Sequence, residues 1–130
     1  MIPIIDDDLN SLEDLVLGMK MTFPNYEIEQ FQYPEEFENA NITNIQILIL
    51  DIMFAGDGEF EGGFDRGIEY YFEFKEKNPD IIVILFTNKT KLSIDKPTLK
   101  IIENNKDIYI EKPSVDIEGF CKLVRETLNK

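Results

Sequence analysis

Five short strand-like segments, four of which are apolar runs closed by polar residues, dominate the hydrophobic pattern of the chain. They lie at Pro3–Asp6, Tyr26–Phe31, Ile45–Asp51, Ile81–Thr87 and Asp107–Glu111. Runs of this length and composition predict buried β-strands. The last three are almost continuously apolar, which favours central strands that are covered on both faces.

Segments with helical periodicity separate these runs. Four apolar residues follow the first strand at the spacing of one helix face, and Ser11 and Asp14 are spaced as a capping box before and within it. Further helices are predicted at Pro34–Ala40, Ile68–Lys77, Lys96–Glu103 (with Asp95 as a possible cap) and Ile117–Leu128. The alternation of strands and helices predicts an α/β protein with a parallel sheet covered by helices on both faces.

Composition narrows the classes of function. The 130 residues are enough for one domain, spanning 1–130, with a single sizeable core. With 26 acidic and 13 basic residues the net charge is −13, which disfavours direct binding to nucleic acid or to anionic membranes. No apolar stretch approaches membrane-spanning length, and the N-terminus enters a strand without a signal peptide.

Cysteine and histidine usage points to the cytoplasm. The single cysteine, Cys121, lies on the apolar stripe of the last predicted helix and reads as a core residue. A disulfide framework is therefore excluded, which fits a reducing cytosol. The sequence contains no histidine, so histidine-type zinc sites and Ser-His chemistry are excluded as well.

Polar residues close four of the apolar runs. Asp6, Asp7 and Asp8 follow the first strand, and Asp51, Thr87 and Lys112 end the third, fourth and fifth. In an open parallel sheet, ligands bind beyond the carboxyl ends of the strands. The sequence therefore predicts one site for a metal ion and a phosphoryl group, centred on Asp51.

The three consecutive acids favour a cation among them, because their charges repel one another. Magnesium suits such a cluster, since it takes one or two carboxylates and bridges to phosphate oxygens. The alternative is that one of the acids caps the first helix. Strand phasing favours Asp6 and Asp7 as the acid pair and helix phasing favours Asp7 and Asp8, so Asp7 is common to both.

The remaining residues suit phosphoryl transfer. A carboxylate at the end of a buried strand, such as Asp51, can act as a nucleophile and form an aspartyl-phosphate. Lys112 supplies a compact ammonium for the phosphoryl oxygens, and Thr87 supplies a hydroxyl donor.

These motifs resemble those of the receiver domains of bacterial two-component response regulators, over essentially the whole chain. The residues that carry the resemblance are Ile4–Asp8, Leu48–Asp51, Ile84–Thr87 and Tyr109–Pro113. The resemblance implies a flavodoxin-like three-layer sandwich, with a five-stranded parallel sheet in the order 2-1-3-4-5.

The resemblance also implies a role for each motif. Asp51 would be the phosphoacceptor, and Thr87 and Lys112 would contact the phosphoryl group. Mg2+ would be held by Asp51, by Asp7 with Asp6 or Asp8, and by the backbone carbonyl of Met53. Tyr109 would follow the movement of Thr87 as a switch, and the peptide bond between Lys112 and Pro113 would often be cis.

By the same resemblance the chain is a signalling module and not a turnover enzyme. A sensor histidine kinase or phosphotransfer protein would supply the phosphohistidine, because this chain has no histidine. Phosphorylation would then change binding to a downstream protein target or output domain.

Several positions depart from the family pattern. Phe54-Ala55 replaces a usual Met-Pro, and Gly67 arrives late for the usual Asp-Gly pair, so the glycine-rich segment Phe54–Arg66 reads as an insertion. This insertion is either a surface loop or an element that shapes access to the site. Asn88 replaces a very small residue, and Asn104–Lys106 replaces a usual Gly-Ala.

Three other readings are compatible with parts of this pattern. A pseudo-receiver would keep the fold and act as an interaction module without being phosphorylated. An aspartate-nucleophile phosphatase would carry a second acid two residues after Asp51, where Met53 stands. A flavodoxin fits poorly, because no Ser/Thr-Gly phosphate loop follows the first strand.

Overall fold

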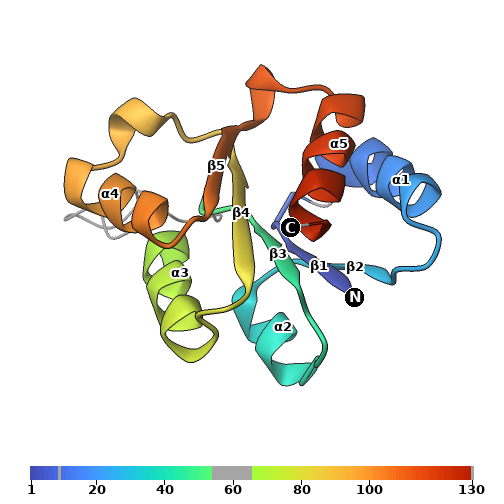
Figure 1. Ribbon diagram of the computed structural model, residues 1–130, viewed down its shortest axis with the longest axis horizontal. Coiled ribbons are helices and arrows are strands. Elements are labelled where there is room, and N and C mark those ends of the chain that lie inside the picture. The colour runs from blue at the N-terminus through green and yellow to red at the C-terminus, as the bar shows by residue number, and fades with distance from the viewer. Residues whose placement is uncertain (9, 54–65, 130) are drawn as a thin grey trace.

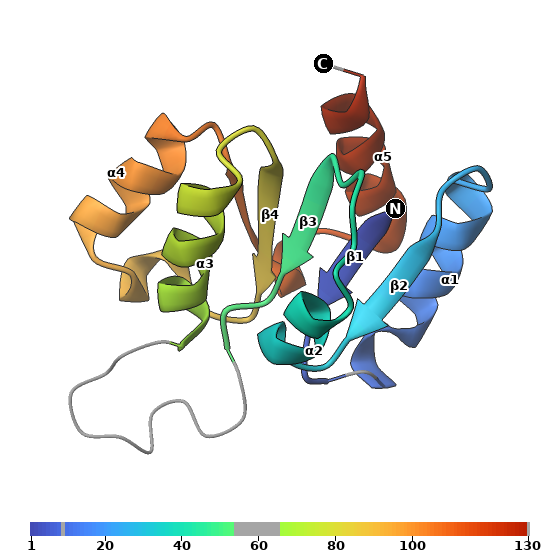
Figure 2. The ribbon, with the colours of Figure 1, turned by 90° about the horizontal axis from the view of Figure 1, so that it is seen from below.

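Five parallel strands form one sheet, as the sequence predicts. The computed structural model describes residues 1–8, 10–53 and 66–129. Its strands are β1 (Ile2–Ile5), β2 (Ile28–Phe31), β3 (Ile47–Leu50), β4 (Ile82–Thr87) and β5 (Ile108–Glu111), and they lie in the order β2-β1-β3-β4-β5 (Figure 1). In Figure 2 the arrowheads of β1, β2 and β3 point to the same edge of the sheet.

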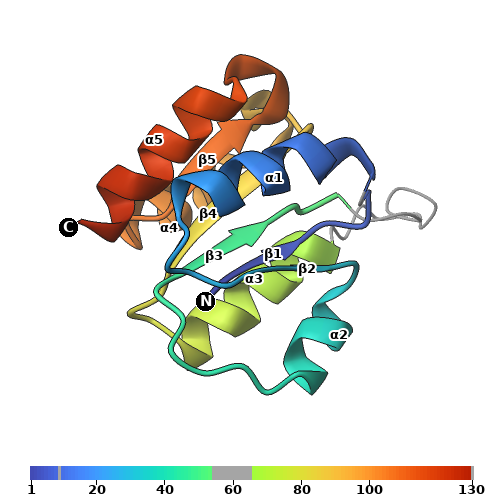
Figure 3. The ribbon, with the colours of Figure 1, turned by 90° about the vertical axis from the view of Figure 1, so that its right-hand side faces the viewer.

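Helices cover both faces of the sheet. The helices are α1 (Glu13–Thr22), α2 (Pro34–Asn39), α3 (Arg66–Lys77), α4 (Lys96–Asn104) and α5 (Ile117–Leu128), with short 3-10 turns η1 (Asn10–Leu12), η2 (Lys91–Ser93) and η3 (Lys112–Ser114). Figure 3 shows α1 and α5 on one side of the sheet and α2 and α3 on the other. The predicted three-layer sandwich is therefore confirmed. None of the helices in the described part of the chain is long and apolar enough to cross a membrane.

Two hydrophobic cores result from the alternation of side chains along the strands. On β3, Leu48 and Leu50 pack with residues of α2, α3 and α4, whereas Ile47 and Ile49 pack with residues of α1 and α5. All four are buried, which explains why this strand is a continuous apolar run. Cys121 is buried in the α1 and α5 core, as predicted.

One expectation about the sheet is wrong. β5 lies at an edge, and its Ile108 and Ile110 are only half-buried, whereas β1 lies inside the sheet with all four residues buried. An apolar run indicates that a strand is covered on both faces, but it does not indicate whether a neighbour pairs with each side.

The local signals at helix ends are only partly realised. The start of the first helix differs from the predicted capping box at Ser11 and Asp14, because η1 takes up Asn10–Leu12 and α1 begins at Glu13, with Leu12 at its N-cap. Asp95 stands before α4, but its side chain accepts no capping hydrogen bond. Asp116, which was not singled out, caps α5 by accepting a 2.7 Å hydrogen bond from the backbone of Gly119. The peptide bond between Lys112 and Pro113 is trans.

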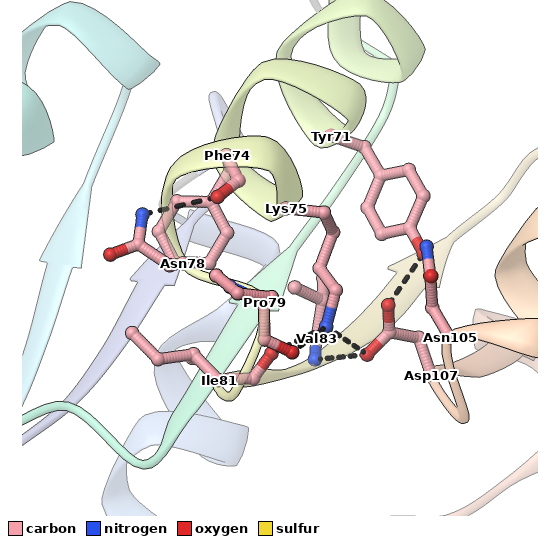
Figure 4. A network of polar contacts seen from close by, with 9 residues as sticks. All are labelled: Tyr71, Phe74, Lys75, Asn78, Pro79, Ile81, Val83, Asn105 and Asp107. Atoms are coloured by element: carbon pink, nitrogen blue, oxygen red, sulfur yellow. Dashed lines mark hydrogen bonds and ion pairs between the residues drawn. The ribbon is translucent and has the colours of Figure 1, made fainter.

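A buried polar network joins α3 to the residue before β5, at the amino ends of β4 and β5 (Figure 4). The ammonium of Lys75 lies 3.2 Å from Asp107 Oδ1, and their side chains are 7% and 0% exposed. Asp107 also accepts hydrogen bonds from the backbone N–H of Val83, at 2.9 Å, and from the hydroxyl of Tyr71. The Asn105 amide donates to the Tyr71 oxygen at 3.1 Å, so the network fastens the end of α4 as well.

Lys75→Met is expected to lower the free energy of unfolding by about 3–5 kcal/mol, because it leaves the Asp107 carboxylate buried without its counter-charge. The double variant Lys75→Met/Asp107→Asn should recover most of this loss, since the introduced amide carries no charge and keeps an oxygen for the N–H of Val83. Urea denaturation followed by circular dichroism measures both variants. A double variant that is as unstable as Lys75→Met alone would contradict the electrostatic reason.

Candidate functional site

The ends of β1 and β3 bring Asp6 and Asp51 to the same edge of the sheet. Ile5 and Leu50 are register partners in these neighbouring parallel strands, and each acid is the next residue along its strand. The backbone N–H of Asp51 donates to the carbonyl of Ile5 at 2.9 Å, which extends the pairing to the acids. Asp6 and Asp51 are only 1% and 4% exposed as whole residues.

Lys112 connects the two carboxylates. It begins η3, directly after β5, and its ammonium lies 2.7 Å from Asp6 Oδ2 and 2.9 Å from Asp51 Oδ2. The same ammonium lies 5.9 Å from the ring centroid of Phe86, within the range of a cation–π contact. The sequence predicted that Lys112 and Asp51 belong to one site, and the structure brings them together.

The second oxygen of each carboxylate is held by the backbone. The N–H of Asp8 donates to Asp6 Oδ1 at 2.8 Å, and the N–H of Met53 donates to Asp51 Oδ1 at 2.9 Å. Each acid thus forms a tight turn with the residue two positions later. Because one oxygen meets Lys112 and the other meets the backbone, both carboxylates are fixed before any ligand arrives.

Burial and charge act in opposite directions on these groups. Burial raises the pKa of Asp6 to about 6, and the charge of Asp51 adds to this, against the lowering effect of the hydrogen bond from Lys112. Burial by itself would lower the pKa of Lys112, but its hydrogen bonds to Asp6 and Asp51 raise that pKa overall. Lys112 is therefore held as a cation, and the carboxyl of Asp6 beside it binds a proton more readily than an ordinary aspartate does.

The three consecutive acids differ in their surroundings. Asp6 is buried, Asp7 is half-buried and Asp8 is exposed. The helix phasing that favoured Asp7 and Asp8 does not extend to them, because α1 begins only at Glu13. Of the three, Asp6 shares the ammonium of Lys112 with Asp51, and the ligand role of Asp7 stays a prediction.

The donor set fits a magnesium ion. Within the described residues, no group of three or more acid, cysteine or histidine side chains is gathered closely enough to hold a metal. Magnesium, however, needs only one or two protein carboxylates and completes its shell with water and phosphate oxygens. Asp6 and Asp51 both meet the ammonium of Lys112, so their oxygens already converge on one positive charge.

Thr87 and Tyr109 both contact the segment that follows β4. Thr87 is fully buried at the end of β4, and its Oγ1 accepts a 3.2 Å hydrogen bond from the backbone N–H of Lys89. The hydroxyl of Tyr109 donates to the carbonyl of Lys89 at 2.7 Å. The two residues predicted to switch together are thus linked through one residue. Asn88, beside Thr87, is exposed.

Two further contacts were not anticipated from the sequence. Glu111 Oε1 accepts a 2.8 Å hydrogen bond from the backbone N–H of Lys91, which fastens η2 to the end of β5. A Cβ on Gly67 would lie 2.3 Å from the backbone of Ile52, so α3 packs directly against the residue after Asp51. Gly67, which stands late for the usual Asp-Gly pair, was a usable signal for the contact with Ile52. Nothing in the sequence indicated the contact made by Glu111.

The glycine-rich insertion predicted at Phe54–Arg66 lies outside the described residues, apart from its last member. Arg66 begins α3 and pairs with Glu35 of α2 at 2.7 Å, with both side chains more than half exposed. A solvent-exposed pair of this kind contributes little to stability.

In the metal-free protein, the carboxyl carbon signal of Asp6 is expected to titrate in NMR with a midpoint near pH 6. From the ordinary value of 3.8 up to about 6, the native protein binds a proton that the unfolded chain has released. The contribution of Asp6 to the free energy of unfolding therefore falls across this range as the pH rises. Lys112→Met should move the midpoint higher, because it removes a hydrogen bond that lowers the pKa. A midpoint at or below 3.8 would contradict the assignment.

Comparison with known proteins identifies the fold through structure and not through sequence. No protein-family model and no curated protein match the sequence. Solved structures do match over nearly the whole chain. The signal receiver domain of a DNA-binding response regulator protein (merR) from Colwellia psychrerythraea 34H superposes with a TM-score of 0.73 at 20% identity, covering 99% of this chain and 98% of that one.

Two regulators from Thermotoga maritima give similar values. TrrA, solved in complex with Mg(2+)-BeF, has a TM-score of 0.68 and 24% identity, with 97% of this chain and 96% of that chain covered. DrrB, an OmpR/PhoB homolog, has a TM-score of 0.71 and 22% identity, and the match covers 98% of this chain but 52% of DrrB. The chain therefore has the fold of the response regulator receiver domains.

Proposed function

We propose that the chain is a phosphoacceptor domain of a two-component or phosphorelay system, phosphorylated on Asp51. The observation that carries the proposal is the convergence of Asp6, Asp51 and Lys112 at the carboxyl edge of the sheet, with distances of 2.7 and 2.9 Å from the ammonium to the two carboxylates. Buried Thr87 ends the neighbouring strand, where it can serve the same phosphoryl group.

In the transfer step, a carboxylate oxygen of Asp51 attacks the phosphorus of a phosphohistidine on a partner protein. The new O–P bond forms as the P–N bond breaks, and the electron pair of that bond leaves with the imidazole. The donor is a sensor histidine kinase or a phosphotransfer protein, since this chain has no histidine. Lys112 balances the charge on the phosphoryl oxygens as a point charge. The chain and its phosphohistidine donor would then meet in the cytoplasm.

A bound Mg2+ would neutralise further charge on the phosphoryl oxygens. Asp51 and Asp6 would hold it together with Asp7 and the backbone carbonyl of Met53, and Asp8 is the weaker candidate because it is exposed. A phosphoryl group on Asp51 carries a charge of roughly −2 in place of the negative charge of the carboxylate, beside the charge of Asp6. The single ammonium of Lys112 does not balance these charges, which is why the proposal includes the ion.

Phosphorylation would be transmitted through the segment after β4. The hydroxyl of Thr87 is free to donate to a phosphoryl oxygen, because in the resting contact with Lys89 its oxygen acts as the acceptor. Movement of Thr87 would displace the backbone of Lys89 and with it the hydrogen bond from Tyr109. The result is a shift between two states of the β4–α4 segment that changes affinity for a downstream protein target or output domain.

The chain is proposed to act as a signalling module and not as a turnover enzyme. A phosphatase that uses an aspartate nucleophile needs a general acid near the leaving group. The residue two positions after Asp51 is Met53, which is 44% exposed and carries no proton to donate.

Asp51→Asn is expected to abolish phosphorylation, because the amide is not a nucleophile for phosphoryl transfer. The protein is incubated with a small phosphodonor and Mg2+, and the mass of the intact chain is measured. Wild-type protein should gain one phosphoryl group. The matched control Asp80→Asn, an exposed acid away from the site, should be labelled like the wild type. Single labelling of Asp51→Asn would contradict the assignment.

A beryllofluoride titration followed by NMR separates this function from that of an unphosphorylated pseudo-receiver. The amides of Asp51, Thr87 and Lys112 should shift only when Mg2+ is present. A titration that leaves these amides unchanged would favour the pseudo-receiver.

The phosphorylated form is expected to be long-lived, because the residue two positions after Asp51 is the apolar Met53, which cannot orient an attacking water. Met53→Asp should speed the loss of label, since a carboxylate can orient that water. Both rates follow from the decay of the phosphorylated mass after the donor is removed. Faster loss from the wild type than from Met53→Asp would contradict the role given to Met53.

A further inference from the structure

A pocket of about 490 Å³ opens between α2, the segment that joins α2 to β3, and the last turn of α3. Helices α2 and α3 lie on the same side of the sheet in Figure 3. Ile45 and Ile81, which line the pocket, stand shortly before β3 and β4, so it lies toward the amino ends of these strands. The proposed phosphoryl site lies beyond their carboxyl ends. We call this hollow the α2–α3 pocket, and its volume is that of a small-molecule site.

The most deeply buried side chains of the α2–α3 pocket are aromatic. Phe37 and Phe74 are 5% and 3% exposed, and their ring centroids lie 6.2 Å apart at an angle of 52°. Ile42, Ile45 and Ile81 are half-buried around them. In the described part of the chain, none of the large apolar side chains that are exposed on the surface lines this pocket. Its apolar atoms are therefore reached by a group that enters the pocket and not by a flat protein surface.

The rim of the α2–α3 pocket carries one charge, and this charge is negative. Among the described residues that line the pocket, Glu38 is the only acidic or basic one. Its Oε1 accepts a 2.7 Å hydrogen bond from the hydroxyl of Tyr70, which orients the carboxylate. Burial and the hydrogen bond to Glu38 raise the pKa of Tyr70 well above its ordinary value, so this hydroxyl stays the donor. A carboxylate has further acceptor positions, so Glu38 can also accept from a ligand.

Two amides on the rim are oriented as acceptors. The side-chain nitrogen of Asn78 donates to the carbonyl of Phe74 at 3.1 Å, and that of Asn41 donates to the carbonyl of Asn39 at 3.3 Å. Figure 4 shows the amide oxygen of Asn78 pointing away from this carbonyl. Because the nitrogens are held by the backbone, the amide oxygens are the groups that remain for the N–H donors of a ligand.

We propose that the α2–α3 pocket binds a small organic cation, namely a primary amine on an apolar or aromatic body. The ammonium would bind Glu38 and the amide oxygens, and the body would lie against Phe37 and Phe74, whose rings also attract a cation. An anion is disfavoured, because residues 34–46 hold three acids and no base in a chain of net charge −13. A hydrated metal ion is disfavoured by the apolar lining, which offers it a single carboxylate.

NMR of the isotope-labelled whole chain, titrated with phenethylamine, tests the proposal. The backbone amides of Asn41, Ile42 and Asn78 should shift in a saturable way. Phenethyl alcohol, which has the same body and a neutral head, should bind about fivefold more weakly, the effect of one solvent-accessible ion pair. Hydrocinnamate, which has a negative head, should leave these amides unchanged. Equal affinities for the amine and the alcohol would overturn the proposal, as would the lack of a saturable shift with the amine.

Matched variants separate the charge from the apolar contact. Glu38→Gln keeps an oxygen for the hydroxyl of Tyr70 and should weaken phenethylamine about fivefold without changing the affinity for phenethyl alcohol. Glu36→Gln, on an exposed acid of the same helix that does not line the pocket, should leave the affinity for the amine within about twofold of wild type. Ile42→Ala should weaken the amine and the alcohol alike, because it removes apolar contact area. Equal losses in the two glutamine variants, or no loss in Ile42→Ala, would overturn the proposal.

Other places and other occupants give different results. Amine-induced shifts confined to Asp6–Asp8 and Asp51 would overturn the proposal, because these acids are the alternative place for a cation. Displacement of phenethylamine by Mg2+ or Ca2+ would assign the pocket to a metal ion, and tighter binding of a lysine-containing peptide would assign it to a partner protein. Either result would overturn the proposal. Asp51→Asn protein should still bind the amine, and a failure of amine binding leaves the labelling of Asp51 intact.

Discussion

The ion pair between Lys112 and the two carboxylates of Asp6 and Asp51 is the contact on which the rest of the site depends. Two acids that are almost fully buried at neighbouring strand ends repel each other and lose hydration, and removing the counter-charge of such a group costs several kcal/mol. Lys112 reaches this position only because the carboxyl end of β5 lies on the same side of the sheet as the carboxyl ends of β1 and β3. A second buried pair, Lys75 with Asp107, holds the start of β5 from α3. The edge strand is thus fixed at both ends by buried charges, which compensates for pairing with only one neighbour.

Much of the fold could be predicted because a buried parallel strand has a continuous apolar sequence with polar residues at its ends. All five strands and all five helices were expected, with boundaries displaced by a few residues. The edge position of β5 could not be found from its apolar run, because burial of both faces and pairing of both edges are separate properties. The buried position of Lys75 could not be predicted either, since a lysine in the last turn of a helix usually faces water. Only the packing of α3 against β4 and β5 places its ammonium on Asp107.

The meeting of Asp51 and Lys112 at one site was predicted from residue type and order, but the detailed arrangement of the acids was not. The crowding of Asp6, Asp7 and Asp8 required a cation, and the sequence argument supplied a metal. In the structure the ammonium of Lys112, which lies 106 residues away in the chain from Asp6, stands beside the carboxylates of Asp6 and Asp51, and the metal stays a prediction. Strand and helix phasing gave two answers for the acid pair, because the boundary between β1 and α1 was unknown. Helix α1 begins only at Glu13, after the 3-10 turn at Asn10–Leu12, so its periodicity does not extend back to the acids. The alternation of side chains along β1 is the pattern that applies to Asp6.

The end of β5 contacts both the proposed phosphoryl site and the segment that follows β4. Side chains alternate along a strand, so Tyr109 and Glu111 point to the same face, and both of them bind the segment that follows β4. Lys112, the next residue, begins a 3-10 turn and reaches in the other direction to Asp6 and Asp51. Adjacent residues thus connect opposite sides of the same strand end. A displacement of Lys112 toward a phosphoryl group would move Glu111, and Glu111 holds the backbone of Lys91 directly before Leu92. The connection from Lys112 to the backbone of Lys91 is therefore only a few covalent bonds and one hydrogen bond long, which favours a coupled movement over two independent ones.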